Sequence, residues 1–338
     1  MHALSRQSKV APPARSHRVR RAVAAGLLPL LLPAVQLQAQ AAIDPNVAPR
    51  AAALEREGER HMAIDLLGRY LATAPDDGRA WLQLGRFYLY DARDWHLHGH
   101  RGEPDGLLYL DFAATALEQS IRLSVDSGVI FRGIAEVERA LVVVEQVGWA
   151  AALTAPGRER APRMPPFVLE LGENLLASCP AGGVLLTGNE LEALSVWYGS
   201  IERPFLDVLP IRPDLYATDS IYRLRMAQAM GVDPALPVQR ALSEVAPRRP
   251  LCLSPGTDSA AVPALAWVPY RLVRVSRAAG PGSEALSVNE LLKAVRQNPS
   301  PWVVDVRGVY DRAASHNLLL CTSLLLLFGD TPPPACRP

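Results

Sequence analysis

A repeated helical pattern near the N-terminal end constrains the fold more than any other feature of the chain. Between residues 53 and 89, apolar residues return at helical spacing, with a small residue in each segment. The positions are Ala63, Leu67, Tyr70 and Pro75 in the first segment, and Trp81, Leu84, Gly85 and Tyr88 in the second. Ala63 and Gly85 would let neighbouring helices approach closely, while Trp81 and Tyr88 would fill the gap to the next pair. The sequence therefore predicts stacked pairs of antiparallel helices.

The second segment reproduces W-x2-L-G-x2-Y, the first-helix signature of the tetratricopeptide repeat, a unit of about 34 residues. The first segment matches the second helix of a preceding repeat, which needs a small residue, two large residues and a proline that ends the helix. Residues 42–153 therefore resemble tetratricopeptide repeats, and a generic helical hairpin is the alternative. The resemblance implies a groove in which Trp81, Arg86 and Tyr88 meet a peptide or protein partner.

The second repeat is interrupted. Its second-helix pattern, which includes Ala113 and Leu117, arrives sixteen residues late, so we expect an inserted loop over residues 91–106. The loop contains His96, His98 and His100 beside several acids, a composition that can bind a transition metal. A solvated polar loop is the favoured interpretation, because nothing in the sequence fixes the histidines in place, and we predict no cofactor.

The first 41 residues have the three parts of a secretory signal: a basic segment, an apolar run and a small-residue site at Ala39 to Ala41. We expect a signal peptide over residues 1–41 and a periplasmic or secreted protein with no stable membrane span after cleavage. An uncleaved anchor is the alternative. The segment holds six of the 35 basic residues, which leaves 29 against 34 acidic ones, so charge gives no support for nucleic-acid binding.

Four cysteines follow the signal: Cys179, Cys252, Cys321 and Cys336. Outside the cytoplasm they could form two disulfides, in any of three pairings. A link between Cys179 and Cys252 is plausible because each lies at or beside a predicted strand. Four buried, unpaired cysteines are the other possibility.

A linker rich in proline and arginine, residues 154–166, precedes a change of pattern. Short apolar runs then alternate with helical segments, which predicts a mostly parallel three-layer α/β domain over residues 167–280. The runs cover 183–187, 205–211, 250–254 and 270–276, and the helical segments cover 190–198 and 219–230. Two helices, over 288–297 and 304–328, should close the domain within a C-terminal part, 281–338.

The end of the first predicted strand is the candidate ligand site of this domain, because ligands of parallel sheets bind at the carboxyl ends of strands. The polar residues there are Thr187, Asn189, Glu190 and Glu192. The two glutamates could act as acid and base or bind a cation. Acids in the first turn of a helix also interact favourably with its dipole without any function, which is the favoured interpretation.

The segment 180–211, with its Trp197–Tyr198 helix and the later Asp207–Val208, resembles the soluble C-terminal region of bacterial protein O-mannosyltransferase-like membrane proteins. The likeness covers about residues 175–330. It places the family's turn aspartates at Glu190 and Glu192. It implies a fold rather than a transferase activity, because the membrane portion of those proteins is missing here.

From these patterns we expect an exported scaffold or protein-interaction protein of the bacterial cell envelope, with an enzyme as the less favoured reading. The alternative is an envelope enzyme or glycan-binding module that uses the turn from Thr187 to Glu192. A concave pocket at that turn would favour the alternative, and a filled edge would favour the scaffold.

Overall fold

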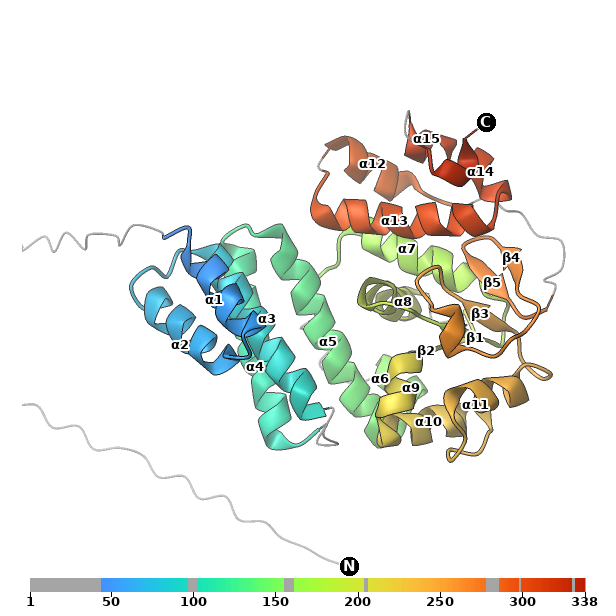
Figure 1. Cartoon of the computed structure of the whole chain (residues 1–338), viewed down its shortest axis with the longest axis horizontal. Coiled ribbons are helices and arrows are strands. Elements are labelled where there is room, and N and C mark those ends of the chain that lie inside the picture. Colours follow the sequence, from blue (N-terminus) through green and yellow to red (C-terminus); the bar gives the residue numbers. More distant parts are fainter. Residues whose placement is uncertain are drawn as a thin grey trace, which may run out of the picture. The chain divides into compact units, whose positions relative to one another are not determined.

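The computed structural model describes residues 44–96, 102–154, 161–203, 206–277, 286–297, 299–329 and 332–337. These residues are mostly helical. Paired helices come first and a small sheet with helices around it follows (Figure 1). The predicted signal peptide and residues 155–160 of the predicted linker lie outside the described residues.

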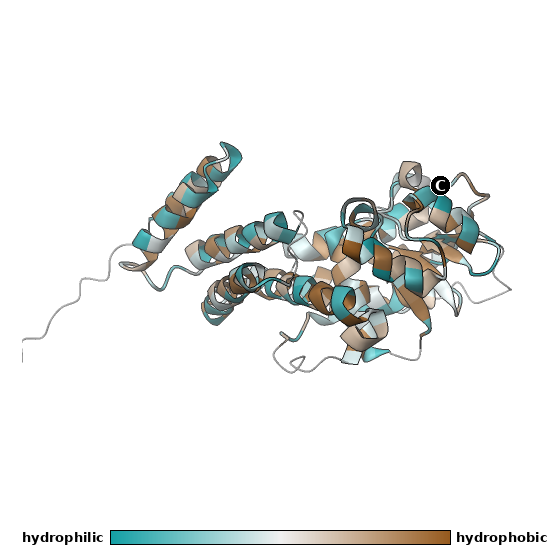
Figure 2. Cartoon of the chain, turned by 90° about the horizontal axis from the view of Figure 1, so that it is seen from below, coloured by the Kyte–Doolittle hydropathy of each residue, from teal (hydrophilic) through white to brown (hydrophobic). Residues whose placement is uncertain are grey.

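Two helix pairs open the described chain. They are α1 (Val47–Arg56) with α2 (Arg60–Leu71), and α3 (Gly78–Trp95) with α4 (Pro104–Arg122). The Asp77 carboxylate begins α3, because it accepts the backbone N–H groups of Arg79 and Ala80 at 3.0 and 3.1 Å. Hydrophilic and hydrophobic residues alternate along these helices (Figure 2). The predicted helix pairs are confirmed.

Small residues allow the close approach of these helices. Ala63 is fully buried in a cluster that includes Ala51 of α1 and Phe87 of α3. At Gly85 an added Cβ atom would lie 2.6 Å from Cγ of Leu117, a residue of α4. Only glycine therefore fits at this crossing of α3 and α4.

The predicted insertion loop over residues 91–106 is wrong in its first and last parts. Helix α3 continues through Trp95, and α4 already begins at Pro104. The extra residues lengthen both helices, because no glycine or proline stands between Asp91 and His96 to stop α3. Proline at the first position of α4 is favourable, since its missing N–H has no partner there.

Helix α5 (Asp126–Val147) follows, and Gly148 separates it from α6 (Trp149–Thr154). The φ angle of Gly148 is 96°, a left-handed conformation that favours glycine and ends the helix. The long helical pattern after Gly128 therefore forms two helices.

The sheet has five strands in the order β2-β1-β3-β5-β4. They are β1 (Gly183–Leu186), β2 (Val208–Ile211), β3 (Leu251–Leu253), β4 (Val268–Tyr270) and β5 (Val273–Val275). Strand β1 pairs in parallel with β2 and β3, while β5 is antiparallel to both β3 and β4. The sheet is thus small and mixed, and the predicted mostly parallel three-layer domain is not confirmed in that form.

Alternate residues of β1 belong to two apolar clusters. Val184 and Leu186 lie in a cluster with residues of α5, α10 and α11, while Leu185 lies in one with residues of α7, α12 and α13. Figure 1 shows α7 and α13 on one side of the sheet and α10 and α11 on the other. The remaining helices of this part are α7 (Pro166–Ala177), α8 (Glu190–Glu202), α9 (Pro213–Thr218), α10 (Ser220–Met230), α11 (Val238–Val245), α12 (Asn289–Gln297) and α13 (Pro301–His316).

The single helix predicted over residues 304–328 is divided into α13, α14 (Leu319–Ser323) and α15 (Leu325–Phe328). The break lies at Asn317, whose backbone is extended and whose side-chain amide donates to the Arg271 carbonyl at 3.1 Å. A contact with a residue 46 positions away in the chain thus ends α13.

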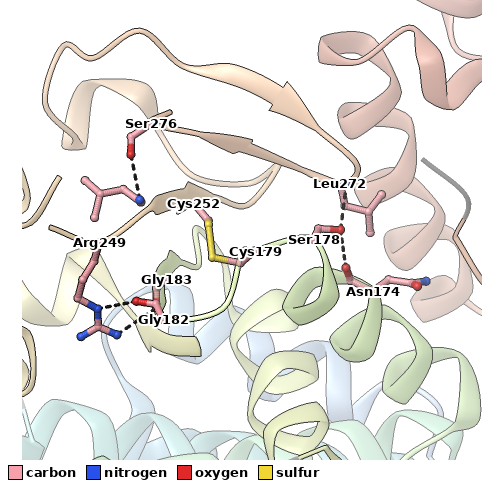
Figure 3. The surroundings of a disulfide bond; sticks show 10 residues. Asn174, Ser178, Cys179, Gly182, Gly183, Arg249, Cys252, Leu272 and Ser276 are labelled. Atoms are coloured by element: carbon pink, nitrogen blue, oxygen red, sulfur yellow. Dashed lines mark hydrogen bonds between the residues drawn. A yellow bond between two sulfur atoms is a disulfide. The ribbon is translucent and has the colours of Figure 1, made fainter. Parts of the chain in front are cut away.

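Two disulfides join the four cysteines, Cys179 to Cys252 and Cys321 to Cys336. Figure 3 shows the first, which joins Cys179, two residues after the end of α7, to Cys252 of β3. Beside it, Arg249 donates to the carbonyls of Gly182 and Gly183 at 2.6 and 3.2 Å. The plausible link between Cys179 and Cys252 is therefore the pairing that the structure contains.

The described helices include none with the length and apolar character that a membrane span needs.

Candidate functional site

The predicted site at the end of β1 is a tight turn held to its neighbours. The backbone N–H of Thr187 donates to the carbonyl of Ile211, at the end of β2, at 3.0 Å. Asn189 begins α8, because its side-chain oxygen accepts the Glu192 N–H at 2.9 Å. The predicted strand, turn and helix are thus present.

Glu192 is fully buried and joins this turn to the one after β3. Its Oε2 accepts the Gly188 N–H at 3.1 Å and the Ser254 hydroxyl at 2.5 Å, and its Oε1 accepts the Gly256 N–H at 2.8 Å. Burial raises the pKa of Glu192, although these three donors act in the opposite direction. The carboxylate therefore cross-links two turns instead of facing solvent.

Glu190 belongs to a separate group of charges. It forms an ion pair with Arg93 of α3, whose Nε also donates to Oε1 of Glu138 in α5 at 2.9 Å. Arg212, which follows β2, lies 3.9 Å from the same oxygen of Glu138. Burial alone would lower the pKa of Arg93, but Glu138 and Glu190 raise it above its ordinary value. The two glutamates thus have different partners and do not act as a pair.

Little space remains at this strand edge. A Cβ atom on Gly188 would lie 2.0 Å from the backbone of Gly256, so the two turns are in contact. Thr187 lines only a small hollow of about 30 Å³ beside Trp149 and Trp197. The edge is filled, which is the outcome that favours the scaffold.

The three residues predicted to line a groove contact other parts of the chain. The indole N–H of Trp81 donates to the Pro75 carbonyl at 2.7 Å. The guanidinium of Arg86 lies 4.7 Å from the ring centre of Phe131. The ring of Tyr88 lies against Phe112, with 5.3 Å between centroids, and burial raises the pKa of its hydroxyl.

Of the three candidate metal ligands, only His96 lies in the described part of the chain. It follows α3, is buried, and has its Nδ1 3.7 Å from Oε2 of Glu138. His98 and His100 lie outside the described residues. Within those residues, no group of three or more His, Cys, Asp or Glu side chains is arranged to hold a metal ion.

A cavity of about 580 Å³ opens instead among the paired helices, and we call it the Arg60 cavity. Its lining comes from the end of α1, the start of α2, the end of α3 and one residue of α4. The residues are Glu55, Gly58, Arg60, His61, Asp91, Asp94, Trp95 and Tyr109. A cavity of this size can hold one or two side chains of a peptide.

Arg60 connects the acids of this cavity. Its Nη1 lies 3.1 Å from Asp91 and 2.5 Å from Asp94, and its Nη2 lies 3.6 Å from Glu55. Three carboxylates thus face one guanidinium and the imidazole of His61. Burial raises the pKa of Asp91, although Arg60 lowers it. Among the described residues, the lining therefore carries more negative than positive charge, beside two aromatic side chains.

This cavity was not predicted, because Asp91 and Asp94 were expected in a loop. Their spacing of three residues, with no helix breaker between them, was the available signal that both lie on one face of α3. Their contact with Arg60, more than 30 positions earlier, has no signal in the sequence.

Comparison with known families finds one match: residues 48–87 match the model described as Tetratricopeptide repeat. These residues cover nearly all of α1, all of α2 and the first part of α3. No curated protein and no solved structure matches the chain. The comparisons thus support the tetratricopeptide resemblance, and give no support to the resemblance of residues 175–330 to O-mannosyltransferase-like proteins.

Proposed function

We propose that this chain is a protein-interaction protein whose tetratricopeptide-like helices bind a segment of a partner protein in the Arg60 cavity. The observation that carries the proposal is the position of the cavity, which is lined on one side by residues 55–61 of the matched repeat and on the other by the end of α3 and one residue of α4. Helical repeats of this kind present extended surfaces to other proteins.

The lining indicates the chemistry of the bound segment. Glu55, Asp91 and Asp94 outnumber Arg60, so a basic side chain of the partner would meet a favourable potential. The ring of Tyr109 attracts the same cations. A lysine- or arginine-containing peptide fits this lining better than an acidic one.

We further propose that the protein acts outside the cytoplasm, in the periplasm or as a secreted protein. The signal-like pattern of residues 1–41 supports this, and so do the two disulfides, since such bonds persist in oxidising compartments. An envelope enzyme or a glycan-binding module at the turn from Thr187 to Glu192 has less support. The groups at that turn bind one another, and its hollow is too small for a sugar.

A matched pair of charge reversals tests the binding proposal. Asp94, on the rim of the cavity, is paired with Arg60 and has a side chain that is 56% exposed; Asp65 of α2 is paired with Arg69 and is 57% exposed. Wild type, Asp94→Lys and Asp65→Lys should be cross-linked in the native host, and the captured proteins compared by quantitative mass spectrometry. We expect a partner that wild type and Asp65→Lys capture and that Asp94→Lys loses by about tenfold, because the added lysine repels a basic segment.

Capture of the same proteins in the same amounts by all three forms would contradict a role for the cavity. Capture of no protein above background by wild type would contradict the interaction function itself. Thermal unfolding of the three proteins confirms that the variants remain folded, as expected for exposed positions.

A further inference from the structure

Arg60 itself occupies part of the cavity that bears its name. It is the first residue of α2, and its Cζ lies 5.5 Å from the centre of the Tyr90 ring while its guanidinium donates to Asp91 and Asp94. An aromatic ring beside carboxylates is an environment that suits a planar guanidinium. About 580 Å³ of the cavity remains open next to it. The chain's own arginine therefore shows which kind of side chain this cavity holds.

The contact of Arg60 with the acids is incomplete. Among the described residues, only Nη1 of Arg60 donates, to Asp91 at 3.1 Å and to Asp94 at 2.5 Å, while Nη2 lies 3.6 Å from Oε1 of Glu55. In the same part of the chain, Nε of Arg60 and Oδ2 of Asp91 are buried and have no hydrogen-bond partner. Two parallel hydrogen bonds from one guanidinium to one carboxylate, the strongest arrangement, are thus not formed. Arg60 is held less firmly than a guanidinium in this place can be.

The position of Arg60 at the start of α2 also favours its release. The N-terminal end of a helix carries partial positive charge, so a cation in the first turn is disfavoured. The turn before α2 contains two exposed acids, Glu57 and Glu59, which offer the guanidinium other partners outside the cavity. A Cβ atom built on Gly58, between them, would meet no described atom within 4 Å, so this turn is loosely packed there. The Arg60 side chain can therefore change partners without disrupting α2.

We propose that the Arg60 cavity is an arginine-binding site, which Arg60 fills in the free protein and from which an arginine of the partner displaces it. This inference rests on the proposed function and names the side chain that the partner contributes. An incoming guanidinium is not tethered to α2, so it can donate through two nitrogen atoms to acids that Arg60 reaches through one. Lysine fits less well, because an ammonium group is not planar and cannot form paired bonds. Arg60 thus lowers the affinity of the cavity for its partner.

Calorimetric titration of the full-length protein with short peptides tests the proposal. The peptides are acetyl-Gly-Arg-Gly-amide and its counterparts with lysine or with citrulline, which has the shape of arginine without the charge. Arg60→Met keeps the apolar stem and removes the guanidinium. We expect it to bind the arginine peptide with a dissociation constant at least about tenfold lower than that of wild type, because nothing has to be displaced. The lysine peptide should bind Arg60→Met about fivefold more weakly than the arginine peptide, and the citrulline peptide at least about tenfold more weakly.

Arg69→Met is the matched control, because Arg69 also lies in α2 and is paired with Asp65. It should bind the peptides as wild type does. Equal or weaker binding of the arginine peptide by Arg60→Met, compared with wild type, would overturn the proposal, since Arg60 would then position the acids instead of blocking them. Equal binding of the lysine and arginine peptides would overturn the assignment to arginine.

Wild type provides a second measurement, which does not depend on the folding of Arg60→Met. In NMR spectra of the arginine side chains, the signal of the buried Nε–H of Arg60 is identified by its loss in Arg60→Lys. An excess of the arginine peptide should shift this signal and speed its exchange with solvent, whereas the citrulline peptide should leave it unchanged. An unchanged signal with the arginine peptide would overturn the displacement. The cross-linking comparison of Asp94→Lys with Asp65→Lys tests the interaction function separately, so a partner captured there would stand even if Arg60 stayed in place.

Discussion

Glu192 illustrates, at the scale of single residues, what the local sequence can and cannot predict. The strand, the capping Asn189 and the acids in the first turn of α8 follow from neighbouring residues, and the structure contains them. The donors to the carboxylate, Ser254 and Gly256, come from a turn more than 60 positions later. Local spacing therefore favoured a dipole role for Glu192, whereas its long-range partners make it a link between two turns.

Replacing Glu192 by glutamine tests that link. The glutamine amide keeps one acceptor oxygen. Its NH₂ group replaces the second oxygen and would face groups that donate hydrogen bonds to that oxygen in the wild type. At pH 5 we expect Glu192→Gln to lower the free energy of unfolding by about 1–3 kcal/mol in urea titrations. Glu202→Gln, at the exposed end of the same helix, should change it by less than about 0.5 kcal/mol.

The raised pKa of Glu192 also gives a pH dependence. The folded state keeps the Glu192 carboxyl protonated at pH values at which the unfolded chain has already released that proton. The stability that protonation contributes is therefore complete below the ordinary glutamate pKa and is lost as pH rises through the folded-state value. The difference in the free energy of unfolding between wild type and Glu192→Gln should therefore become smaller from pH 5 towards pH 8. A constant or increasing difference would contradict the raised pKa.

At the scale of helices and strands, local patterns predicted where most elements lie but not where tertiary contacts end them. The spacing of Ala63 and Gly85 located α2 and α3, and each of the four predicted runs coincides with one of β1, β2, β3 and β5. The break at Asn317 depends on the distant Arg271. The antiparallel β4–β5 pair was missed, because three-residue strands carry almost no periodicity.

Two glycines in α2 and α3 provide a test of helix packing. Alanine at Gly68 would meet no atom within 4 Å, so Gly68→Ala should stabilise the protein by roughly 0.5–1 kcal/mol through helix propensity. Alanine at Gly85 would meet Leu117 at 2.6 Å, so Gly85→Ala should destabilise it by about 1–3 kcal/mol. Urea titrations measure the free energy of unfolding of both variants. If Gly85→Ala stabilised the protein as Gly68→Ala does, α3 and α4 would not be closely packed at Gly85.

At the scale of the whole molecule, the largest apolar cluster connects the second helix pair and α5 with the sheet. It contains Leu89 of α3, Leu117 of α4 and Ile130 of α5 together with Val184 and Leu251 of the sheet. The second helix pair therefore shares a core with the sheet, as expected for too few repeats to be stable alone, while buried residues of α1 and α2 lie in a separate cluster with α3. Which surfaces meet in this way depends on packing between segments far apart in the chain, so sequence spacing could not supply it.

The two disulfides belong to another apolar cluster, that of α7, α12 and α13, and should stabilise the protein to different extents. Cys179 and Cys252 close a loop with a sequence separation of 73 residues between α7 and β3, while Cys321 and Cys336 close one of only 15 near the C-terminal end. Because a cross-link restricts the unfolded chain more when its loop is longer, replacing both cysteines by alanine should cost about 4 kcal/mol for the first bond and about 3 kcal/mol for the second. Urea unfolding of the two double variants measures the difference, with mass spectrometry to verify that the remaining bond is intact. A larger cost for the shorter loop would mean that the second bond stabilises the folded C-terminal helices directly.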